Sequence, residues 1–386
     1  MLAIKAGTIM TMGQKGTITD GVVLIEEGKV KKVGQNVEIP QNADVHNYPE
    51  ATVIPGMIDA HTHLGIGEEG IGWEGRDYNE TTDPITPHLR AIDAINPDDQ
   101  GFKDARQNGI TTVMTSPGSA NILGGESLAL KTRGHVVDEM VVKSPVGIKA
   151  AFGENPKRVY KEKDKSPTTR MAIAAEMRQA FQKTEDYLES KNKKEEDDSF
   201  ERDIKWESLG RVLRGEIPLK AHAHRADDIM TALRISREFG FDLTIEHCTE
   251  GHLIARELAE AGVYTVVGPS LSTRSKVELK KRDFKTAAVL VEAGIKVAVM
   301  SDHPVIPVDG LNLYAALSAK AGLKREEALK TITINPAEIL GIADRVGSIE
   351  KDKDADIAIF SGDPLSLATE IAAVYIEGDK VEIKPD

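Results

Sequence analysis

Two histidines separated by one residue, His61 and His63, follow the apolar segment 53–60. In a β-strand, residues i and i+2 point to the same face, so both imidazoles can face one cavity at the carboxyl end of this strand. Neutral imidazole nitrogens bind zinc and the neighbouring first-row metals. The pair therefore predicts two ligands of a divalent metal ion, with zinc preferred and iron or manganese as alternatives, in a site completed by distant residues.

Further residues that can bind metals follow three later strand-like segments. They are His222, His224, His247, Asp302 and His303. The chain has only 10 histidines, so this concentration at strand ends exceeds what scattered surface histidines would give. If the strands form a closed barrel, their carboxyl ends converge on one mouth. We therefore expect a single site assembled from several strands.

The middle of the chain alternates strand-like and helix-like segments, which is typical of a parallel sheet with crossover helices. Strands are expected at 53–60, 111–114, 145–152, 219–221, 242–246, 264–267 and 296–300. Helices are expected at 98–108, 168–190, 226–239, 251–261, 284–293 and 311–320. These are seven strands where a (β/α)8 barrel of the TIM type needs eight, and we expect the missing one near 136–142.

Both ends of the chain consist of short strands broken by turns. Glu27-Gly28, between two β-branched runs, indicates a hairpin. Each end is too short to form its own core. We therefore expect residues 1–52 and 345–386 to form one composite β-sandwich domain beside an α/β barrel domain over residues 53–344.

The composition narrows the class of partner and compartment. The net charge of −13 argues against a nucleic acid or an anionic membrane as partner. A single cysteine, Cys248, fits a reducing compartment, and no apolar stretch approaches the roughly 20 residues of a membrane helix. We therefore expect a cytoplasmic homo-oligomer that acts on a small molecule.

The ordered combination of motifs resembles the amidohydrolase superfamily, in its imidazolonepropionase-like subgroup. The resemblance rests on segment 55–63, His222, His247, Asp302 and the tail segments 335–341 and 347–356. It covers nearly the whole chain. It implies a metal-dependent (β/α)8 barrel with a composite β-sandwich from both termini, which agrees with the layout above.

The resemblance also implies roles for individual residues. Four histidines become metal ligands: His61, His63, His222 and His247. Asp302 contacts the metal or its water and serves as general base. In such proteins a carboxylated lysine or a glutamate bridges two ions, so one or two ions are expected. We favour Glu154, which follows the strand at 145–152, because Lys149 lies deeper within that strand; Lys149 remains the alternative.

The remaining candidates are assigned to substrate binding. His224 and Arg225 follow the ligand His222 and are placed on the rim, where the arginine offers a rigid fork of donors to a carboxylate or phosphate. An ion pair of Arg225 with Asp227 or Asp228 at a helix amino end is the competing interpretation. His303 is expected to orient substrate. Asn121 belongs to a glycine-rich loop, 116–127, that is expected over the mouth.

These predictions favour a hydrolase that cleaves a C–N bond, either an amide or a cyclic amide, with metal-activated water and Asp302 as base. Deaminase or isomerase chemistry on the same site is an alternative, and so is a non-catalytic metal-binding barrel, against which the complete ligand set argues. Imidazolonepropionases have a glutamate three residues after the ligand that corresponds to His222, where this chain has Arg225. We therefore expect a substrate other than imidazolonepropionate.

Overall fold

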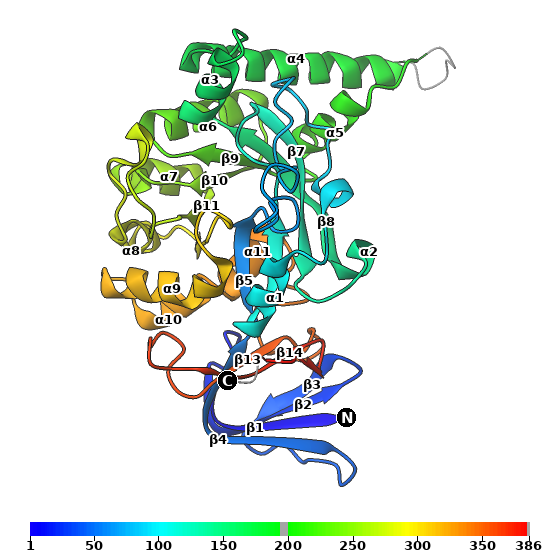
Figure 1. Cartoon of the computed structure of the whole chain (residues 1–386), viewed down its shortest axis with the longest axis vertical. Helices are drawn as coiled ribbons and strands as arrows, with labels where there is room; N and C mark the ends of the chain where they lie inside the picture. The colour runs from blue at the N-terminus through cyan, green and yellow to red at the C-terminus, as the bar shows by residue number, and fades with distance from the viewer. Residues whose placement is uncertain (194–199, 384–386) are drawn as a thin grey trace.

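A computed structural model describes residues 1–193 and 200–383 of the chain. Strands from both termini form one seven-stranded sheet, in the order β15-β14-β13-β4-β1-β2-β3 (Figure 1). The strands are β1 (Leu2–Met10), β2 (Thr17–Glu26), β3 (Lys29–Gly34), β4 (Asp44–Pro55), β13 (Ile357–Phe360), β14 (Ile371–Ile376) and β15 (Asp379–Lys380). β4 pairs in parallel with β1 and antiparallel with β13. Both ends of the chain thus contribute strands to one sheet.

The terminal sheet has a core to which both ends contribute. Ile4 and Val23 from the amino-terminal strands pack in one buried cluster with Ile357 and Tyr375 from the carboxyl-terminal strands. The hairpin expected at Glu27-Gly28 is present. Both residues have positive φ (50° and 75°), the conformation that a tight two-residue turn requires.

The second sheet has eight strands in the order β12-β11-β10-β9-β8-β7-β6-β5. The strands are β5 (Met57–Thr62), β6 (Ile110–Thr115), β7 (Leu123–Lys131), β8 (Val141–Ala151), β9 (Leu219–Ala223), β10 (Leu243–His247), β11 (Tyr264–Val267) and β12 (Val297–Val299). Two backbone hydrogen bonds bring its edges together: Asp302 donates to the His61 carbonyl at 3.1 Å, and His63 donates to the His303 carbonyl at 2.8 Å. The sheet is therefore a nearly closed barrel.

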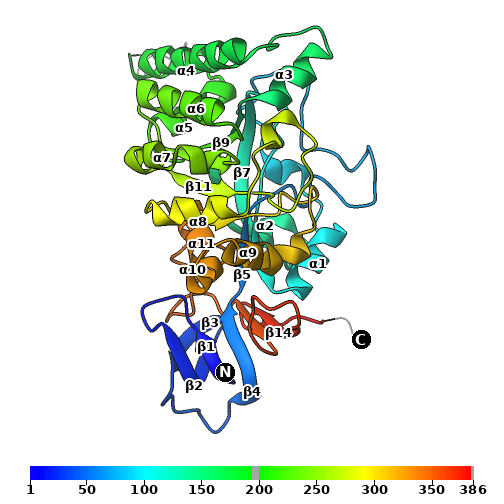
Figure 2. The same ribbon diagram turned by 90° about the vertical axis from the view of Figure 1, so that its left-hand side faces the viewer.

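Helices cover the outside of the barrel (Figures 1 and 2). They are α1 (Gln100–Gln107), α2 (Val137–Met140), α3 (Glu154–Lys161), α4 (Arg170–Lys193), α5 (Ile204–Leu213), α6 (Ala226–Phe239), α7 (Ala255–Ala261), α8 (Lys285–Glu292), α9 (Leu311–Lys320), α10 (Arg325–Lys330) and α11 (Ile334–Leu340). The six helices predicted from the sequence are all present, and α6 and α9 have the predicted bounds.

The eighth barrel strand lies elsewhere than predicted. It is β7, which runs antiparallel to both β6 and β8, whereas residues 136–142 hold α2 and the first residues of β8. Gly124 and Gly125 suggested a loop. Gly125 has a φ of 124°, and a Cβ there would lie 2.4 Å from the Leu89 carbonyl oxygen. Glycine at this position therefore lets the backbone of Leu89 pack closely against the buried strand β7.

The apolar segment 53–60 is two strands and not one. β4 ends at Pro55 in the terminal sheet, and β5 begins at Met57 in the barrel. A Cβ on the intervening Gly56 would lie 2.1 Å from Thr111 Oγ1, so only glycine fits where the chain passes between the sheets. The residues on both sides of Gly56 are buried, which explains why the apolar pattern of segment 53–60 continues through the point where one strand ends and the next begins.

The two sheets are also joined by a buried charge cluster. The Lys131 ammonium at the end of β7 lies 2.6 Å from Asp356 Oδ2 and 3.0 Å from Asp354 Oδ2, and all three side chains are nearly inaccessible.

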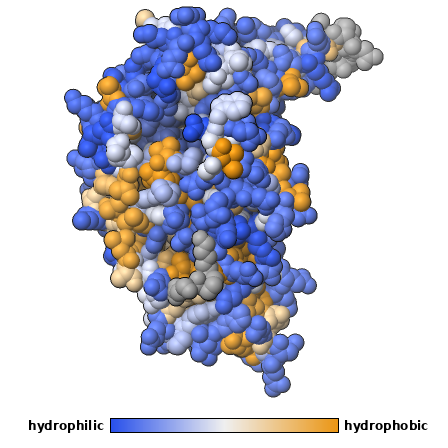
Figure 3. All heavy atoms as spheres, in the orientation of Figure 1, coloured by the Kyte–Doolittle hydropathy of each residue, from blue (hydrophilic) through white to orange (hydrophobic). Residues whose placement is uncertain are grey.

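The face of the molecule in Figure 3 is mostly hydrophilic, with apolar residues in small scattered groups. None of the helices in the described residues has the length and apolar character of a bilayer span.

Candidate metal centre

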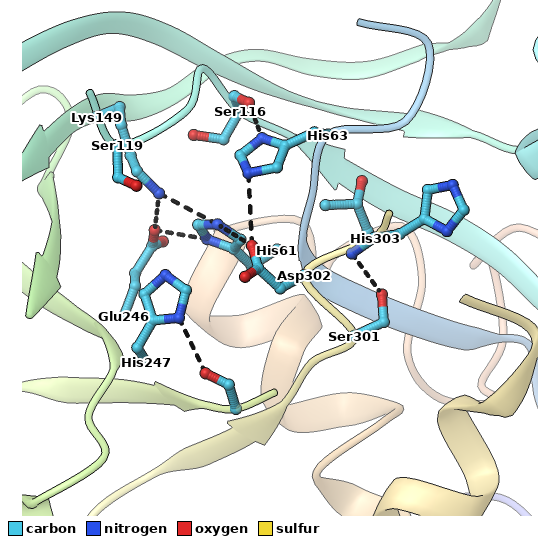
Figure 4. A network of polar contacts seen from close by, with 12 residues as sticks. His61, His63, Ser116, Ser119, Lys149, Glu246, His247, Ser301, Asp302 and His303 are labelled. Atoms are coloured by element: carbon cyan, nitrogen blue, oxygen red, sulfur yellow. Dashed lines mark hydrogen bonds and ion pairs between the residues drawn. The ribbon is translucent and has the colours of Figure 1, made fainter. Parts of the chain in front are cut away.

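His61 is the last but one residue of β5 and is completely buried. Its Nε2 lies 3.4 Å from Asp302 Oδ1, and His63 Nε2 lies at the same distance from that oxygen (Figure 4). Asp302 follows β12, the strand that meets β5 at the barrel seam. The two histidines predicted to share a face therefore do so, and the aspartate predicted to act with them lies between their Nε2 atoms.

Hydrogen bonds to backbone carbonyls fix the ring orientation of two histidines. His63 Nδ1 donates to the Ser116 carbonyl at 2.7 Å, and His247 Nδ1 donates to the Gly268 carbonyl at 3.0 Å. A carbonyl can only accept, so each ring carries its proton on Nδ1 and presents the Nε2 lone pair to the cavity. This arrangement is typical of metal-ligating histidines.

The imidazoles form two overlapping groups. Nitrogens of His222, His224 and His247 lie within 4.8 Å of one another, as do the ligand atoms of His61, His247 and Asp302. Both nitrogens of His222 and Nε2 of His247 are buried without a hydrogen-bond partner in the described residues. Buried polar atoms without partners are costly, and a metal ion would satisfy them. The residues present therefore fit a divalent ion with nitrogen-rich ligands.

Burial adjusts the protonation of these groups. Burial, together with the charges of neighbouring groups, lowers the pKa of His222 and of His247 well below the ordinary histidine value. Burial raises the pKa of Asp302, but the neighbouring imidazoles of His247, His61 and His63 outweigh it, so this pKa is well below the usual range. Neutral imidazoles beside an ionised carboxylate are the states in which these side chains bind metal.

The backbone is strained at the ends of two strands that carry ligands. His247 has a φ of 70° and Asp302 a φ of 58°, in the left-handed region that non-glycine residues rarely adopt. At His247 the distortion breaks the alternation of the strand. As a result, consecutive residues face the site: Glu246 contacts His61, and His247 lines the cavity.

Asp59 connects the first and last strands beneath the site. Its Oδ1 accepts from the His61 N–H at 3.1 Å, and its Oδ2 accepts from Ser301 N–H at 3.0 Å and from Ser301 Oγ at 2.6 Å. Burial raises the pKa of Asp59 to about 6. Ser301 precedes Asp302, so this buried carboxyl holds the general-base candidate in register with His61. Sequence reasoning did not single out Asp59.

The structure brings Lys149 to the cluster and does not bring Glu154 there. Lys149 Nζ lies 3.1 Å from His61 Nε2 and 3.2 Å from Glu246 Oε2. Glu154 begins α3, where its backbone N–H donates to Glu278, and its side chain joins neither ligand group. The preference for Glu154 was based on the depth of Lys149 in the strand. Lys149 does lie two residues below the level of His222, but its long side chain spans that distance.

Glu246 and Lys220 are buried charges that the sequence analysis left out. Glu246 Oε2 lies 2.6 Å from His61 Nδ1, and Glu246 Oε1 lies 3.2 Å from Lys220 Nζ. Lys220 faces Lys149 across the β8–β9 pair. The signal was present in the sequence, because Lys220 precedes His222 by two residues and shares its strand face.

The four residues assigned to substrate have different surroundings. His224 lines the cavity, and its Nδ1 forms a hydrogen bond of 2.7 Å with Thr249 Oγ1. Arg225 forms two 2.8 Å contacts with Asp227 at the start of α6. The ion pair at the helix amino end, which was the competing interpretation, is therefore present. Arg225 does not line the cavity, and neither do the other two residues assigned to substrate, Asn121 and His303.

Asn121 and His303 are buried behind the cavity wall. The Asn121 amide donates to the Asp83 carbonyl and to Thr86 Oγ1, which ties loop 116–122 to the preceding long loop. The His303 ring is directed away from the histidine cluster and packs against Gly101 of α1 (Figure 4). Asp302 and His303 lie in a turn after β12, and the left-handed φ of Asp302 in that turn accompanies the separation of the two side chains.

The cluster opens into a cavity of about 380 Å³. Its polar lining residues are His63, Tyr78, Asn79, Ser119, Lys149, Asn155, Arg158, His222, His224, His247, Ser272, Ser275, Lys276 and Asp302. The volume suits a small molecule. Lys276 and Ser119 come from loops and Asn155 from the first turn of α3, and sequence patterns gave no sign that they would meet.

Comparison with known proteins places this site in a family. Residues 52–384 match the amidohydrolase family. The amidohydrolase tasK of Hapsidospora irregularis is 29% identical over 93% of this chain, which spans 39% of tasK. An imidazolonepropionase of Pseudomonas putida (strain GB-1) is 26% identical over 90% of this chain and 89% of its own length.

Solved structures agree. An amidohydrolase from Thermotoga maritima MSB8 is 44% identical, with a TM-score of 0.96 over 100% of both chains. A prolidase complexed with N-methylphosphonate-L-proline is 16% identical, with a TM-score of 0.64 over 99% of this chain and 100% of its own, and shares the fold. Since the family match spans most of the sequence and the histidine cluster lies at the barrel mouth, the chain belongs to the amidohydrolase family of metal-dependent hydrolases and resembles its imidazolonepropionase-like members.

Proposed function

We propose that this protein hydrolyses a C–N bond, in an amide or cyclic amide of a small molecule, with Asp302 as general base. The observation that carries the proposal is the position of Asp302. Its carboxylate lies 3.4 Å from the Nε2 atoms of both His61 and His63 and lines the cavity. A base in this position reaches both the proposed metal ligands and a molecule in the cavity.

A divalent ion held by the histidines, zinc in first place, would lower the pKa of a water molecule toward neutrality and polarise the scissile carbonyl. Asp302 takes the proton of the attacking water and returns it to the leaving nitrogen, so that one carboxylate serves both proton transfers. The hydrogen bonds from Ser301 to Asp59 keep the Asp302 segment in place during these transfers.

We further propose Lys149, in place of Glu154, as the bridging ligand of a site with two ions. Addition of carbon dioxide to the neutral amine forms an N–C bond, releases one proton and leaves a carbamate with two ligand oxygens. The contact of Lys149 Nζ with His61 Nε2 supports this role. Glu154 has no such contact.

The Asp302→Asn variant tests the mechanism. An amide fills the same space but cannot take a proton at neutral pH, so metal content should stay near that of the wild type while turnover falls by about 10²–10⁴-fold. The assay is hydrolysis of a panel of amides, cyclic amides and dipeptides, with metal content measured per chain. Asp227→Asn, which changes an exposed carboxylate outside the cavity, is the matched control. Wild-type turnover by metal-loaded Asp302→Asn would exclude Asp302 as the base.

A further inference from the structure

Two loops and the first turn of α3, which follow three different barrel strands, meet at one side of the cavity. Ser119 follows β6, Asn155 lies in the first turn of α3 after β8, and Lys276 follows β11. Asn155 accepts from Lys276 Nζ at 2.7 Å and donates to Ser119 Oγ at 2.8 Å. We call these three residues the loop wall. Both ends of the Asn155 amide are occupied, so its orientation is set and the lysine is held at a defined place.

One carboxylate in the described residues lies within ion-pair distance of Lys276, near the upper limit of that distance. In the described residues, the acidic group that meets it within 4 Å is Glu278 Oε1, at 3.8 Å. An ammonium has three donors, and the hydrogen bond to Asn155 engages one of them. The Lys276 side chain retains 30% of its exposure and lines the cavity, so donors remain for a molecule bound there.

The charges around the cavity are unevenly distributed. Lys149, Arg158 and Lys276 line it, whereas Asp302 is the one carboxylate in the described lining. Lys149 is paired with buried Glu246, and Arg158 contacts Glu162 of its own helix at 3.5 Å. Arg158 has 54% of its side chain exposed and Lys276 has 30%, so Lys276 is the more deeply placed of the two cations that a bound anion can approach inside the cavity. It also lies near the histidines, because Glu278 Oε1 is 3.8 Å from Lys276 Nζ and 3.6 Å from His224 Nε2.

Resting on the amide hydrolysis proposed above, we infer that the loop wall binds a carboxylate of the substrate through Lys276, so that the substrates are amides that carry a free carboxylate. A carboxylate carries one negative charge and accepts the remaining ammonium donors, whereas a phosphate dianion would leave one charge unpaired. Binding at the loop wall would orient the scissile bond toward Asp302 and the histidines. Lys276 is thus a specificity-determining residue.

The experiment compares N-acetyl amino acids with their carboxamides and with N-acetyl aminophosphonates of the same side chain. Binding to the metal-loaded protein is measured by calorimetry, and hydrolysis by amine release. We expect carboxylates to bind roughly 10- to 100-fold more tightly than carboxamides, which is the range for a hydrogen bond to a charged group. Lys276→Met should remove this difference, and Lys276→Arg should retain part of it.

Two more variants sharpen the test. Asn155→Asp places a permanent carboxylate beside Lys276 and should weaken the binding of substrate carboxylates as Lys276→Met does. Lys281→Met removes an exposed lysine of the same loop, outside the cavity lining, and should leave the preference unchanged. An unchanged preference in Lys276→Met would overturn the inference.

The outcomes separate this inference from the proposed function. Equal binding of carboxylates and carboxamides to the wild type would overturn the carboxylate subsite even if amides are hydrolysed. Tighter binding of the phosphonates would overturn the choice of carboxylate. A carboxylate preference that depends on Lys276, without hydrolysis of the panel, would support the subsite while contradicting hydrolysis of these amides.

Discussion

Two sides of the cavity are built by different means. The side with His61, His63, His222, His247 and Asp302 stands on strand ends, and backbone carbonyls and the buried Asp59 carboxyl hold its side chains. The loop wall stands on two loops and the first turn of α3, and contacts between its own side chains hold it together. A strand-borne site is rigid because the barrel ladder positions it, whereas loops tolerate change. Variants on the strand side should therefore affect metal binding and all turnover, and loop-wall variants should affect the choice of substrate.

The largest effect is expected from removing a histidine on the strand side. His222→Ala should lose bound metal, because both nitrogens of this buried ring lack other partners and few ligands remain. Turnover of every substrate should fall by more than the roughly 10⁴-fold upper limit for loss of a general base. Metal content per chain is the measurement, and His252→Ala, which changes a histidine bonded to Thr286, is the control. Wild-type metal stoichiometry in His222→Ala would contradict the ligand assignment.

The pair Lys149→Met and Glu154→Gln comes next. Methionine preserves much of the lysine volume but provides no carbamate, so metal affinity should fall by at least the roughly 10- to 100-fold that loss of a supporting group costs. Glu154→Gln should leave metal affinity within about twofold of the wild type, because its side chain joins neither ligand group. Metal titrations of both variants make the comparison. Loss of metal in Glu154→Gln alone would restore glutamate as the bridge.

A smaller effect concerns stability and pH. The pKa of Asp59 is raised from 3.8 to about 6 in the folded chain, with burial as the main cause. Between these pH values the folded state binds more protons than the unfolded state, so the Asp59 contribution to the free energy of unfolding falls as pH rises from about 4 to 6 and stays low above 6. The difference corresponds to roughly 3 kcal/mol.

Asp59→Asn cannot titrate, so its free energy of unfolding should lack this decline. Urea denaturation of both proteins at pH 4.5 and pH 7, with a chelator to remove metal binding from the balance, measures the difference. Asp227→Asn should behave like the wild type, since Asp227 is exposed and outside the Asp59 network. The same pH dependence in wild type and Asp59→Asn would mean that Asp59 ionises normally in the folded protein.

The regular half of the barrel was readable from the sequence because each strand there is followed by a helix. From β9 to β12 the predicted strands lie within one or two residues of the observed ones. Between β6 and β8 the chain makes a reversed strand in place of a helix, and Gly124-Gly125 in a fully buried segment looked like a turn. Burial on both faces removes the alternation that identifies a strand, so local pattern could not reveal β7.

The sequence by itself determined which strand ends carry the candidate ligands. A histidine or aspartate at the end of an apolar strand has its position set by the strand, and for His61, His63, His222, His247 and Asp302 that was enough to predict a common site.

Tertiary structure decided what depends on side-chain reach and on contacts across the fold. Whether Lys149 or Glu154 meets the histidines depends on the length of a lysine side chain rising along β8, and the direction of His303 depends on packing against α1. The loop wall joins residues 119, 155 and 276 through hydrogen bonds from two loops to the first turn of α3. Such contacts have no local signal, because each loop acquires its partners only when the barrel closes.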